Sequence, residues 1–496
     1  MASTAFKVVV PQIVVGGFDS HSPPLIESFP MNKAEKSDPR SQLPSVSEIL
    51  EQPSIKEKID KYSYPGVLEI IKSTLDESRE KITEVRQFPN LKDILTDILT
   101  KIEKNHKQDL KPVVNATGII LHTGLGRAVL PDNAVKAISE LNHCCNLQID
   151  METGKRGKRH YRTEKLLCQL TGSEAAHIVN NNAGATFLIL AALCNNKEII
   201  ISRGQLIEIG GSYRLPDCIH QSGAKMVEVG TTNKTHFKDY QEALTENTGA
   251  ILHVNPSNYH IMGFSKQVPI KELVKLKKEK PVIIIDDLGC GALENMEEWG
   301  LPYEPTAGDS ITAGADLVCF SGDKLIGGAQ AGIIVGKREL IDKIKAHPLS
   351  RMLRAGKLTD MVLEKTLRLF LDKEKLVKQN PTYKMLTMPA KKIRKRVRNF
   401  IKRISGLDLI FKIDNIQCES AVGGGSMPQA SLHSWGLSIS SDKISAEKIS
   451  YLLRDYKVPI ISYIEKGQVI LDFRTVLGQD EEEAIIKALK YVNNLG

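Results

Sequence analysis

Short apolar segments alternate with helical segments from about residue 112 to residue 372, and this alternation constrains the fold more than any other feature of the sequence. Seven of the apolar segments have the length and composition of strands: 176–179, 198–202, 226–229, 251–254, 282–285, 317–320 and 333–335. Such alternation over about 260 residues predicts a large α/β domain, expected at 111–375, with a central, mainly parallel sheet. Open parallel sheets bind ligands at the carboxyl ends of their strands, so the residues there are the first candidates for a site.

The segment before this domain predicts a small helical domain over residues 41–110. Apolar residues recur at four-residue spacing within 67–75, and a second apolar stripe covers 91–102, as expected for amphipathic helices. Residues 1–40 contain five prolines and no sustained period. We therefore expect a mobile tail ahead of the helical domain.

Residues 407–496 predict a small α+β domain. Its expected strands are 409–413, 437–440, 459–464 and 469–473, and its expected helices are 446–455 and 481–491. Short strands alternating with amphipathic helices are typical of such a domain.

The formal net charge of +8 originates in one stretch of the chain. Residues 375–407 contain eleven Lys and Arg and no Asp or Glu, so the rest of the chain is mildly acidic. Within this stretch, at 376–406, Ile393, Val397, Phe400 and Ile401 follow helical spacing and predict an amphipathic basic helix. A solvated basic face and a phosphate contact both fit this pattern, which differs from a uniformly basic nucleic-acid coat.

The cysteines and the apolar runs exclude several classes of protein. The eight cysteines occur singly or as the pair Cys144-Cys145, without CxxC spacing, so we expect no metal site. No apolar run approaches the roughly 18–20 residues of a membrane span. The N-terminus lacks the features of a secretory signal, and we expect a cytoplasmic protein with reduced thiols.

The most informative motif is Ser-Gly-Asp-Lys-Leu-Ile-Gly-Gly at 321–328, directly after an expected strand. Lys324, flanked by glycines, is placed to form a Schiff base with the aldehyde of pyridoxal phosphate, and Ser321 is placed to reach the phosphate. Asp286 and Asp287 follow another expected strand. A pyridine nitrogen that stays protonated needs a carboxylate; we favour Asp287, 37 residues before Lys324, and leave Asp286 as the alternative.

A third motif, Asn-Asn-Asn-Ala-Gly-Ala-Thr at 180–186, lies between an expected strand and a helix expected over 186–193. Small residues allow backbone N–H groups at a helix N-terminus to approach an anion. An Asn-capped helix with nothing bound also fits. Fold-type-I pyridoxal phosphate enzymes have the same order of phosphate loop, aspartate and lysine, which makes this segment a candidate phosphate loop. Its candidate ligands are Asn182, Ala183, Gly184 and Ala185.

Nine ordered motifs carry a more specific resemblance. They are residues 115–118, 122–128, 180–185, 202–211, 228–236, 257–259, 287–289, 321–324 and 347–351. With these motifs, residues 41–496 closely resemble the bacterial selenocysteine synthase family, the L-seryl-tRNA(Sec) selenium transferases. The family's usual Ser is replaced by Cys290, which is either mechanistic or a packed thiol.

The resemblance implies a pyridoxal phosphate enzyme that converts seryl-tRNA(Sec) to selenocysteinyl-tRNA(Sec) with selenophosphate. Water is eliminated to give an aminoacrylyl-tRNA, to which selenium adds. Lys324 would hold the cofactor and remove the α-proton, and Asp287 would pair with the pyridine nitrogen. The resemblance further implies that 41–110 reads the tRNA and that the chain forms a ring-like homo-oligomer built of dimers.

The resemblance also assigns the selenophosphate contacts to arginines. They are Arg156 and Arg351, followed by Arg159 and Arg127. Asp323, next to Lys324, would orient Arg351. An arginine fork suits phosphate oxygens because it is planar and bidentate.

Two other functions fit parts of the sequence. Shorter relatives of the family resemble pyridoxal phosphate lyases that act on phosphorylated sugar acids or on amino acids. A non-catalytic tRNA-binding protein on a pyridoxal phosphate fold is the second alternative. The helical domain at 41–110 argues against the lyase, and the presence of Lys324, Asp287 and the 180–186 segment argues against the non-catalytic protein.

Overall fold

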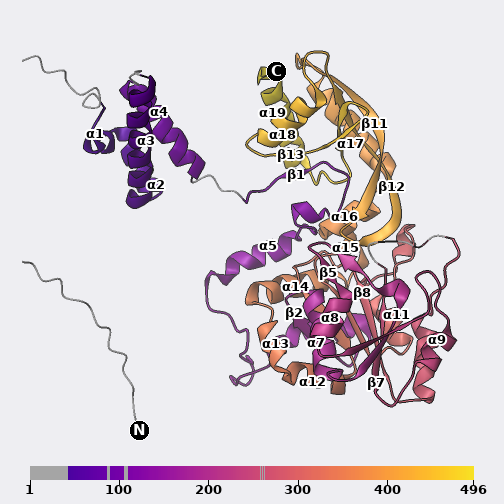
Figure 1. Cartoon of the computed structure of the whole chain (residues 1–496). Helices are drawn as coiled ribbons and strands as arrows, with labels where there is room; N and C mark the ends of the chain where they lie inside the picture. The colour runs from indigo at the N-terminus through magenta and orange to yellow at the C-terminus, as the bar shows by residue number, and fades with distance from the viewer. Residues whose placement is uncertain are drawn as a thin grey trace, which may run out of the picture. The chain divides into compact units, whose positions relative to one another are not determined.

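The computed structural model describes residues 43–85, 90–105, 110–256, 259, 261 and 263–495. The tail expected at 1–40 lies outside the described residues. The chain divides into two compact units, Met1–Lys111 and Pro112–Gly496, which carry the indigo and the magenta-to-yellow colours of Figure 1.

The first unit is helical, as its apolar spacing predicts. Its helices are α1 (Val46–Leu50), α2 (Pro53–Lys61), α3 (Tyr64–Val85) and α4 (Leu91–Asn105). Both apolar stripes are buried in one cluster, where Ile71 and Leu75 of α3 pack with Ile94, Ile98 and Ile102 of α4. Ser45 begins α1 with a capping box, in which its side chain accepts from the backbone N–H of Glu48.

The second unit contains a seven-stranded sheet of order β2-β10-β9-β8-β7-β3-β6. Every strand expected between 176 and 335 is confirmed, with bounds β2 (Ala175–Val179), β3 (Glu198–Ser202), β6 (Lys225–Val229), β7 (Thr248–Val254), β8 (Ile283–Gly289), β9 (Leu317–Ser321) and β10 (Gly332–Gly336). Only β10 runs antiparallel to its neighbours within this sheet. The α/β class with a mainly parallel sheet is therefore confirmed.

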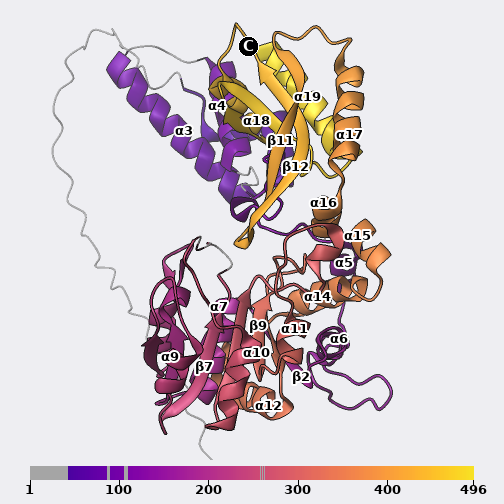
Figure 2. The same ribbon diagram turned by 90° about the vertical axis from the view of Figure 1, so that its right-hand side faces the viewer.

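Helices cover both faces of this sheet (Figures 1 and 2). Alternate side chains of a strand enter different apolar clusters: Ile199 and Ile201 pack on one face and Ile200 on the other. One face is covered by α7 (Asn182–Leu193), α8 (Leu215–Gln221) and α12 (Arg338–Ala346). The other is covered by α6 (Tyr161–Thr171), α10 (Ile270–Leu273), α11 (Ala307–Thr312) and α14 (Lys357–Leu369).

Shorter elements connect these layers. They are α5 (Asp132–Ser139), α9 (Phe237–Glu242), α13 (Pro348–Met352), α15 (Lys373–Gln379), α16 (Pro381–Thr387), β4 (Glu208–Ile209) and β5 (Tyr213–Arg214). None of the described helices is long and apolar enough to cross a membrane.

The C-terminal part of the second unit contains a four-stranded sheet of order β11-β12-β15-β14. Its elements are α17 (Ala390–Ile404), β11 (Lys412–Gly423), β12 (Ser426–Ser440), α18 (Ala446–Asp455), β14 (Tyr463–Glu465), β15 (Gln468–Asp472) and α19 (Gln479–Leu495). A separate parallel pair joins β1 (Val114–Asn115) to β13 (Ile460–Ile461). The expected helices at 446–455 and 481–491 are confirmed.

Of the first two strands expected in this region, 437–440 is confirmed as the end of β12, whereas 409–413 overlaps β11 only at its last two residues. In place of two short strands, β11 and β12 form one long hairpin that reaches toward the large sheet (Figure 2). Its buried side is partly polar: Ser420 and Ser434 each donate a 2.6 Å hydrogen bond to the fully buried Asp472. Because serines occupy these buried positions, the apolar alternation in the sequence is interrupted there.

Glycine allows the segment after β1 to approach the same carboxylate. Gly118 has a φ of +74°, and a Cβ at this position would lie 2.4 Å from Asp472 Oδ2. Both the backbone conformation and the space therefore require glycine. Beyond it, the backbone N–H of Leu121 donates to Val422 O at 2.7 Å, next to the hairpin tip.

Candidate active site

The candidate catalytic residues lie at the carboxyl ends of adjacent strands. Asp287 belongs to the end of β8 and Ser321 is the last residue of β9, and Asp287 is in register with Cys319. Lys324 follows Ser321 by three residues. Residues 37 positions apart in sequence are thus brought to one edge of the sheet, as expected for ligand binding in this class of fold.

Asp287 is the centre of a hydrogen-bond network. Its carboxylate accepts from Asn182 Nδ2 at 2.8 Å, Thr186 Oγ1 at 2.7 Å and the backbone N–H of Gly289 at 3.0 Å. Burial raises the pKa of Asp287, and these donors oppose that shift. No lysine or arginine forms an ion pair with this carboxyl group among the described residues, so it is buried without a cationic partner.

Asp286 faces different partners. It accepts from Ser310 Oγ at 2.6 Å and lies 2.7 Å from His253 Nδ1. Its side chain is therefore committed to α11 and β7. The geometry favours Asp287 over Asp286 as the residue that faces a ligand.

The helix expected to begin at Thr186 begins four residues earlier. α7 starts at Asn182, and the Asn181 side chain caps it by accepting from the backbone N–H of Gly184 at 2.8 Å. The proposed phosphate loop is therefore the first turn of a helix. This correction follows from the three consecutive asparagines, any of which suits the N-cap position.

Lys324 is half-buried beside these groups. Burial lowers its pKa, the neighbouring Arg127 lowers it further, and Cys290, Asp323 and Asp287 partly oppose the shift. A lower pKa makes more of the amine neutral near pH 7, which a nucleophile or a base requires.

The preceding glycine permits the tight loop that presents Lys324. A Cβ on Gly322 would lie 2.7 Å from Ala329 O, so no larger residue fits.

Cys290 is fully buried, and its Sγ donates to Glu304 Oε1 at 2.6 Å. Burial, followed by the nearby Glu304, raises the pKa of Cys290 well above its ordinary value. The protonated thiol is a poor nucleophile. Of the two interpretations of Cys290, the packed thiol agrees with this geometry.

Arg127 and Asp323 form an ion pair, with 2.8 Å between Arg127 Nη1 and Asp323 Oδ2. The expectation that Asp323 orients Arg351 is therefore not met within this chain. Arg127 and Asp323 are 196 positions apart, and neither motif indicates that they pair.

The remaining candidate arginines have no carboxylate partner among the described residues. Arg156 and Arg351 are exposed. Arg159 is half-buried with an Nε that has no hydrogen-bond partner, and burial followed by the nearby Arg354 lowers its pKa. Arg159 and Arg354, which have no carboxylate partner in the part of the chain that the structure describes, lie near each other, and like charges in this arrangement favour an anionic ligand.

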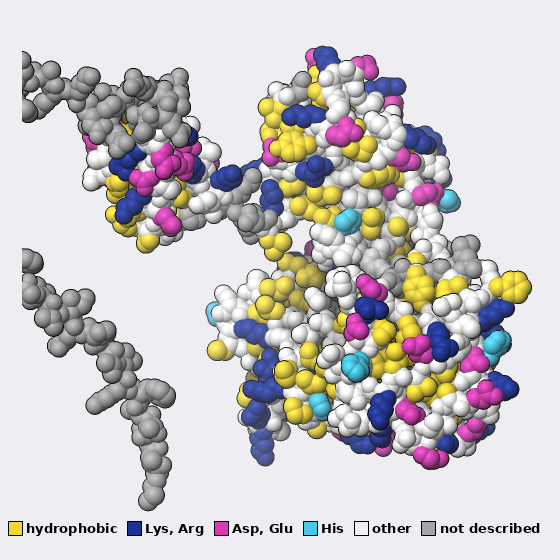
Figure 3. Space-filling model, viewed as in Figure 1, with side chains coloured by type: hydrophobic (Ala, Val, Ile, Leu, Met, Phe, Trp, Pro, Cys, Tyr) yellow, Lys and Arg dark blue, Asp and Glu magenta, His cyan; other side chains and the backbone are white. Residues whose placement is uncertain are grey.

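Two features extend this basic region. Arg354 was missed by the sequence motifs, although its position three residues after Arg351 is a signal that could have found it. Figure 3 shows Lys and Arg side chains gathered on the loop that follows α5, which contains Arg156 and Arg159.

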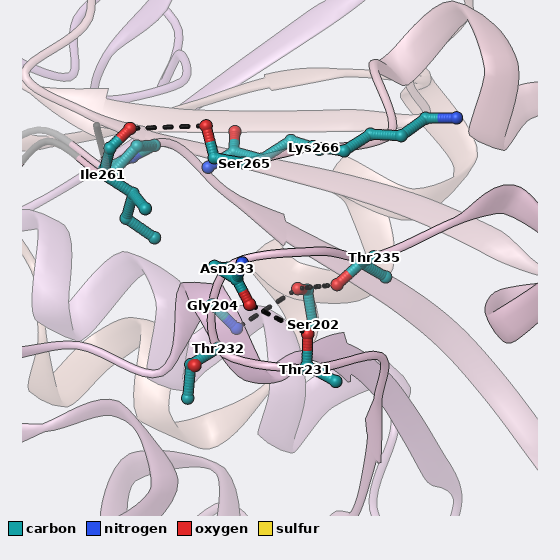
Figure 4. A pocket seen from close by; sticks show the side chains of 11 residues that line it. Ser202, Gly204, Thr231, Thr232, Asn233, Thr235, Ile261, Ser265 and Lys266 are labelled. Carbon is teal, nitrogen blue, oxygen red and sulfur yellow. Dashed lines mark hydrogen bonds between the residues drawn. The ribbon is translucent and has the colours of Figure 1, made fainter. Parts of the chain in front are cut away.

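A polar cavity of about 280 Å³ lies at the carboxyl ends of β3, β6 and β7 (Figure 4). Its wall includes Ser202, whose Oγ lies 2.6 Å from Thr235 Oγ1, and the backbone of Gly204. Tyr259 donates its hydroxyl to Gly204 O; residues 257 and 258 lie outside the described residues. The motifs at 202–211 and 228–236 are thus brought together at the same sheet edge as Asp287.

Comparison with known proteins identifies the family. Residues 113–477 match the family model described as "SelA: L-seryl-tRNA selenium transferase". The chain belongs to this family. A relative from Clostridium perfringens (strain 13 / Type A), named L-seryl-tRNA(Sec) selenium transferase, is 45% identical over 393 residues, 79% of this chain and 85% of the relative. A relative of the same name from Haemophilus influenzae is 43% identical over 444 residues, 88% of this chain and 96% of the relative.

Among solved structures, this selenium transferase family member resembles the one titled "Structure of D-Glucosaminate-6-phosphate Ammonia-lyase". The TM-score is 0.54 at 19% identity, with 79% of this chain and 98% of the other covered. At that identity the likeness concerns the fold, which is the one expected from the order of strands and helices.

Proposed function

We propose that this chain converts L-seryl-tRNA(Sec) to L-selenocysteinyl-tRNA(Sec), with pyridoxal phosphate as cofactor and selenophosphate as selenium donor. The observation that carries the proposal is the placement of Lys324, Asp287 and the first turn of α7 at one sheet edge. It occurs in a chain that is 45% identical to a named L-seryl-tRNA(Sec) selenium transferase.

The residues present fit pyridoxal phosphate. Asp287 is a buried carboxylate without a cation, and the buried Asn182 Oδ1 has no hydrogen-bond partner. The backbone N–H groups of Asn182 and Ala183 open a helix and donate to no acceptor among the described residues, an arrangement suited to a phosphate. The residues that would hold the phosphate are Asn182, Ala183 and Ser321; Gly184 and Ala185, whose N–H groups already bond to Asn181, would contribute by their small size. When bound, the cofactor supplies an aldehyde for Lys324 and an electron sink for the substrate α-carbon.

The protein's own groups then move protons and fix charge. Lys324 Nζ, whose pKa is lowered by burial, takes the proton from Cα of the seryl group. The β-hydroxyl leaves as water with a proton from solvent, the selenium of selenophosphate bonds to Cβ, and Lys324 Nζ returns its proton to Cα. Water cleaves the Se–P bond, and the phosphorus leaves as phosphate. Asp287, whose position is fixed by three hydrogen bonds, would keep the ring nitrogen of the cofactor protonated through its negative charge.

Selenophosphate needs fixed cations, and five arginines would supply them. They are Arg156, Arg351, Arg159, Arg127 and Arg354. Arg127 is oriented by Asp323, and the like charges of Arg159 and Arg354 become favourable once an anion lies between them.

Replacement of Arg351 by Ala is expected to raise the KM for selenophosphate by about 10–100-fold, because a charge-assisted hydrogen bond contributes about 1.5–3 kcal/mol. Two quantities should change little: the turnover at saturating selenophosphate, and the affinity for tRNA. Steady-state kinetics with each substrate varied in turn measure this split. The matched control is Arg338→Ala, which removes an arginine already bonded to Glu174; an equal KM change there would contradict the assignment.

The test of the function is conversion of seryl-tRNA(Sec) in the presence and absence of selenophosphate. We expect selenocysteinyl-tRNA(Sec) only when selenophosphate, pyridoxal phosphate and the full chain are all present. Turnover of free phosphorylated sugar acids with no turnover of seryl-tRNA would overturn the proposal in favour of a lyase. A chain that begins at Pro112, the first residue of the second unit, should keep the cofactor's absorbance and lose tRNA conversion.

Three further features belong to the same proposal. The helical unit at 41–110 binds the tRNA, the chain works as a ring-like homo-oligomer of dimers, and the compartment is the cytoplasm. Large exposed apolar side chains beside the arginines, among them Met352 and Tyr161, support an oligomer. All eight cysteines are unpaired, as is usual in a reducing compartment.

A further inference from the structure

The acid-free segment forms helix α17, whose sides differ sharply in chemistry. Ile393, Val397, Phe400 and Ile404 are buried against the C-terminal sheet. The side chains on the directly opposite face are Lys391, Lys395, Arg398 and Lys402, spaced i, i+4, i+7, i+11, and all four are exposed. We call these four residues the outer basic row.

Three arginines on the flanks of α17 are already engaged within the chain. Arg396 and Arg403 pair with Glu482 of α19 at 2.9 and 3.0 Å. Arg394 lies over the ring of Trp435, 4.2 Å from its centroid. These arginines hold α17 to its neighbours, and the segment's cation count therefore overstates the charge available to a partner.

The outer basic row has no such partner. None of its members forms an ion pair or a hydrogen bond through its side chain with any residue that the structure describes. Like charges one turn apart destabilise a helix, and no acid between residues 375 and 407 offsets them. Four unneutralised cations along about 16 Å of one helix face form a stripe suited to an extended polyanion.

The row also belongs to a firmly placed element. Arg474, buried at 3% exposure, donates to Met385 O at 2.7 Å and Met388 O at 3.0 Å, just before α17 begins. α17 packs along the β11–β12 hairpin at the edge of the C-terminal region (Figure 2). The tip of the same hairpin lies against Leu121 and places Ser426 beside Cys290, next to the candidate site.

We propose that the outer basic row of α17 is a docking surface for the phosphate backbone of the substrate tRNA. The inference rests on the proposed function: only the aminoacyl end of a tRNA enters the site, so its charged body lies on the outside of the protein. Contacts of this kind add affinity without reading sequence. A membrane surface is the less suitable partner, because the apolar side of α17 is buried and none of it is free to enter lipid.

The test compares full-length variants by their affinity for unacylated tRNA(Sec) over a range of salt concentrations. In K391Q/K395Q/R398Q/K402Q, we expect affinity at low salt to fall about 10–100-fold. The slope of log K against log salt should become shallower by about 2–4, roughly one for each lost phosphate contact. If this variant does not fold, K395Q and R398Q as single changes should each reduce the slope by about one.

Two controls remove cations outside the outer basic row, and the second of them removes the same number of charges. R396Q/R403Q, on the same helix, removes cations that are already paired, so it should lower thermal stability and leave the salt slope unchanged. K225Q/K271Q/K275Q/K278Q removes four exposed lysines of the large domain that form no ion pair among the described residues and should not change the slope.

The outcomes separate this inference from the proposed function. If the wild-type protein binds no tRNA(Sec), the function and the inference both fall. If it binds and converts the tRNA while the quadruple α17 variant keeps the wild-type affinity and slope, the docking surface alone is overturned. Binding of phosphatidylserine-containing vesicles that depends on the outer basic row, with tRNA binding unchanged, would also overturn it.

Discussion

Replacement of Lys324 by Ala is expected to reduce tRNA conversion by at least about 10⁴-fold, because the same amine binds the cofactor and moves the α-proton. The visible absorbance of lysine-bound cofactor should disappear at the same time. Lys324→Arg should be equally inactive, since a guanidinium is not deprotonated in proteins. Absorbance after addition of pyridoxal phosphate, followed by the conversion assay, measures both effects.

The matched control is Lys343→Ala, on the exposed side of α12, which should leave absorbance and turnover unchanged. Far-ultraviolet circular dichroism should be the same for all variants. A Lys324→Ala protein that keeps the cofactor covalently bound, on another lysine, would show that the assignment of Lys324 is wrong.

Replacement of Asp287 by Asn is expected to reduce turnover by about 10²–10³-fold, the usual cost of removing a group that stabilises developing charge. The change keeps the size of the side chain, and its Oδ1 can still accept from Asn182 and Gly289. Its Nδ2 would donate to Thr186 Oγ1, where the carboxylate accepts. What the change removes is the negative charge that would hold the ring nitrogen protonated. The loss should therefore be in turnover more than in protein folding.

The pH dependence of stability gives a second test of the same change. Burial raises the pKa of Asp287 in the folded, cofactor-free protein. In the unfolded chain the same carboxyl group has its ordinary, lower pKa. The wild-type protein therefore loses stability as the pH rises above the pKa of the unfolded chain. Asn does not titrate, and cofactor-free Asp287→Asn should become progressively more stable than wild type from acid to neutral pH.

Thermal unfolding of both cofactor-free proteins at several pH values measures this difference. With pyridoxal phosphate present, the wild-type protein should gain stability and the variant should gain less. Asp286→Asn is the control: it replaces one of the two oxygens that contact His253 and Ser310 with an NH2 group, so it should destabilise the fold. A difference between wild type and Asp287→Asn that does not change with pH would contradict the role of the buried charge.

The strands of the large sheet were predictable because most of their residues are buried, which produces continuous apolar runs such as those of β9 and β10. The order of the 180–186 segment, Asp287 and Lys324 was equally readable, because each follows such a run. The start of α7 could not be predicted. Which of Asn180, Asn181 and Asn182 caps the helix depends on the direction of the chain at the end of β2.

Long-range polar pairs could not be predicted from the sequence, for a different reason. Arg127 and Asp323 come from distant segments, and nothing in either motif marks the other as its partner. The β11–β12 hairpin was missed because its buried residues include Ser420 and Ser434, whose burial is made favourable by one carboxylate, Asp472. Polar burial of this kind depends on a partner that only the folded chain supplies.

The pairing of β1 with β13 has a consequence for biosynthesis. Val114 is in register with Ile460, so a strand made early in translation stays without its partner until about 350 further residues have been added. At about 5–20 residues per second, that interval is roughly 20–70 s. During it, the exposed backbone of residues 114 and 115 is available to other partners, such as chaperones. The C-terminal region closes only when nearly the whole chain has left the ribosome, which makes its assembly a late step of folding.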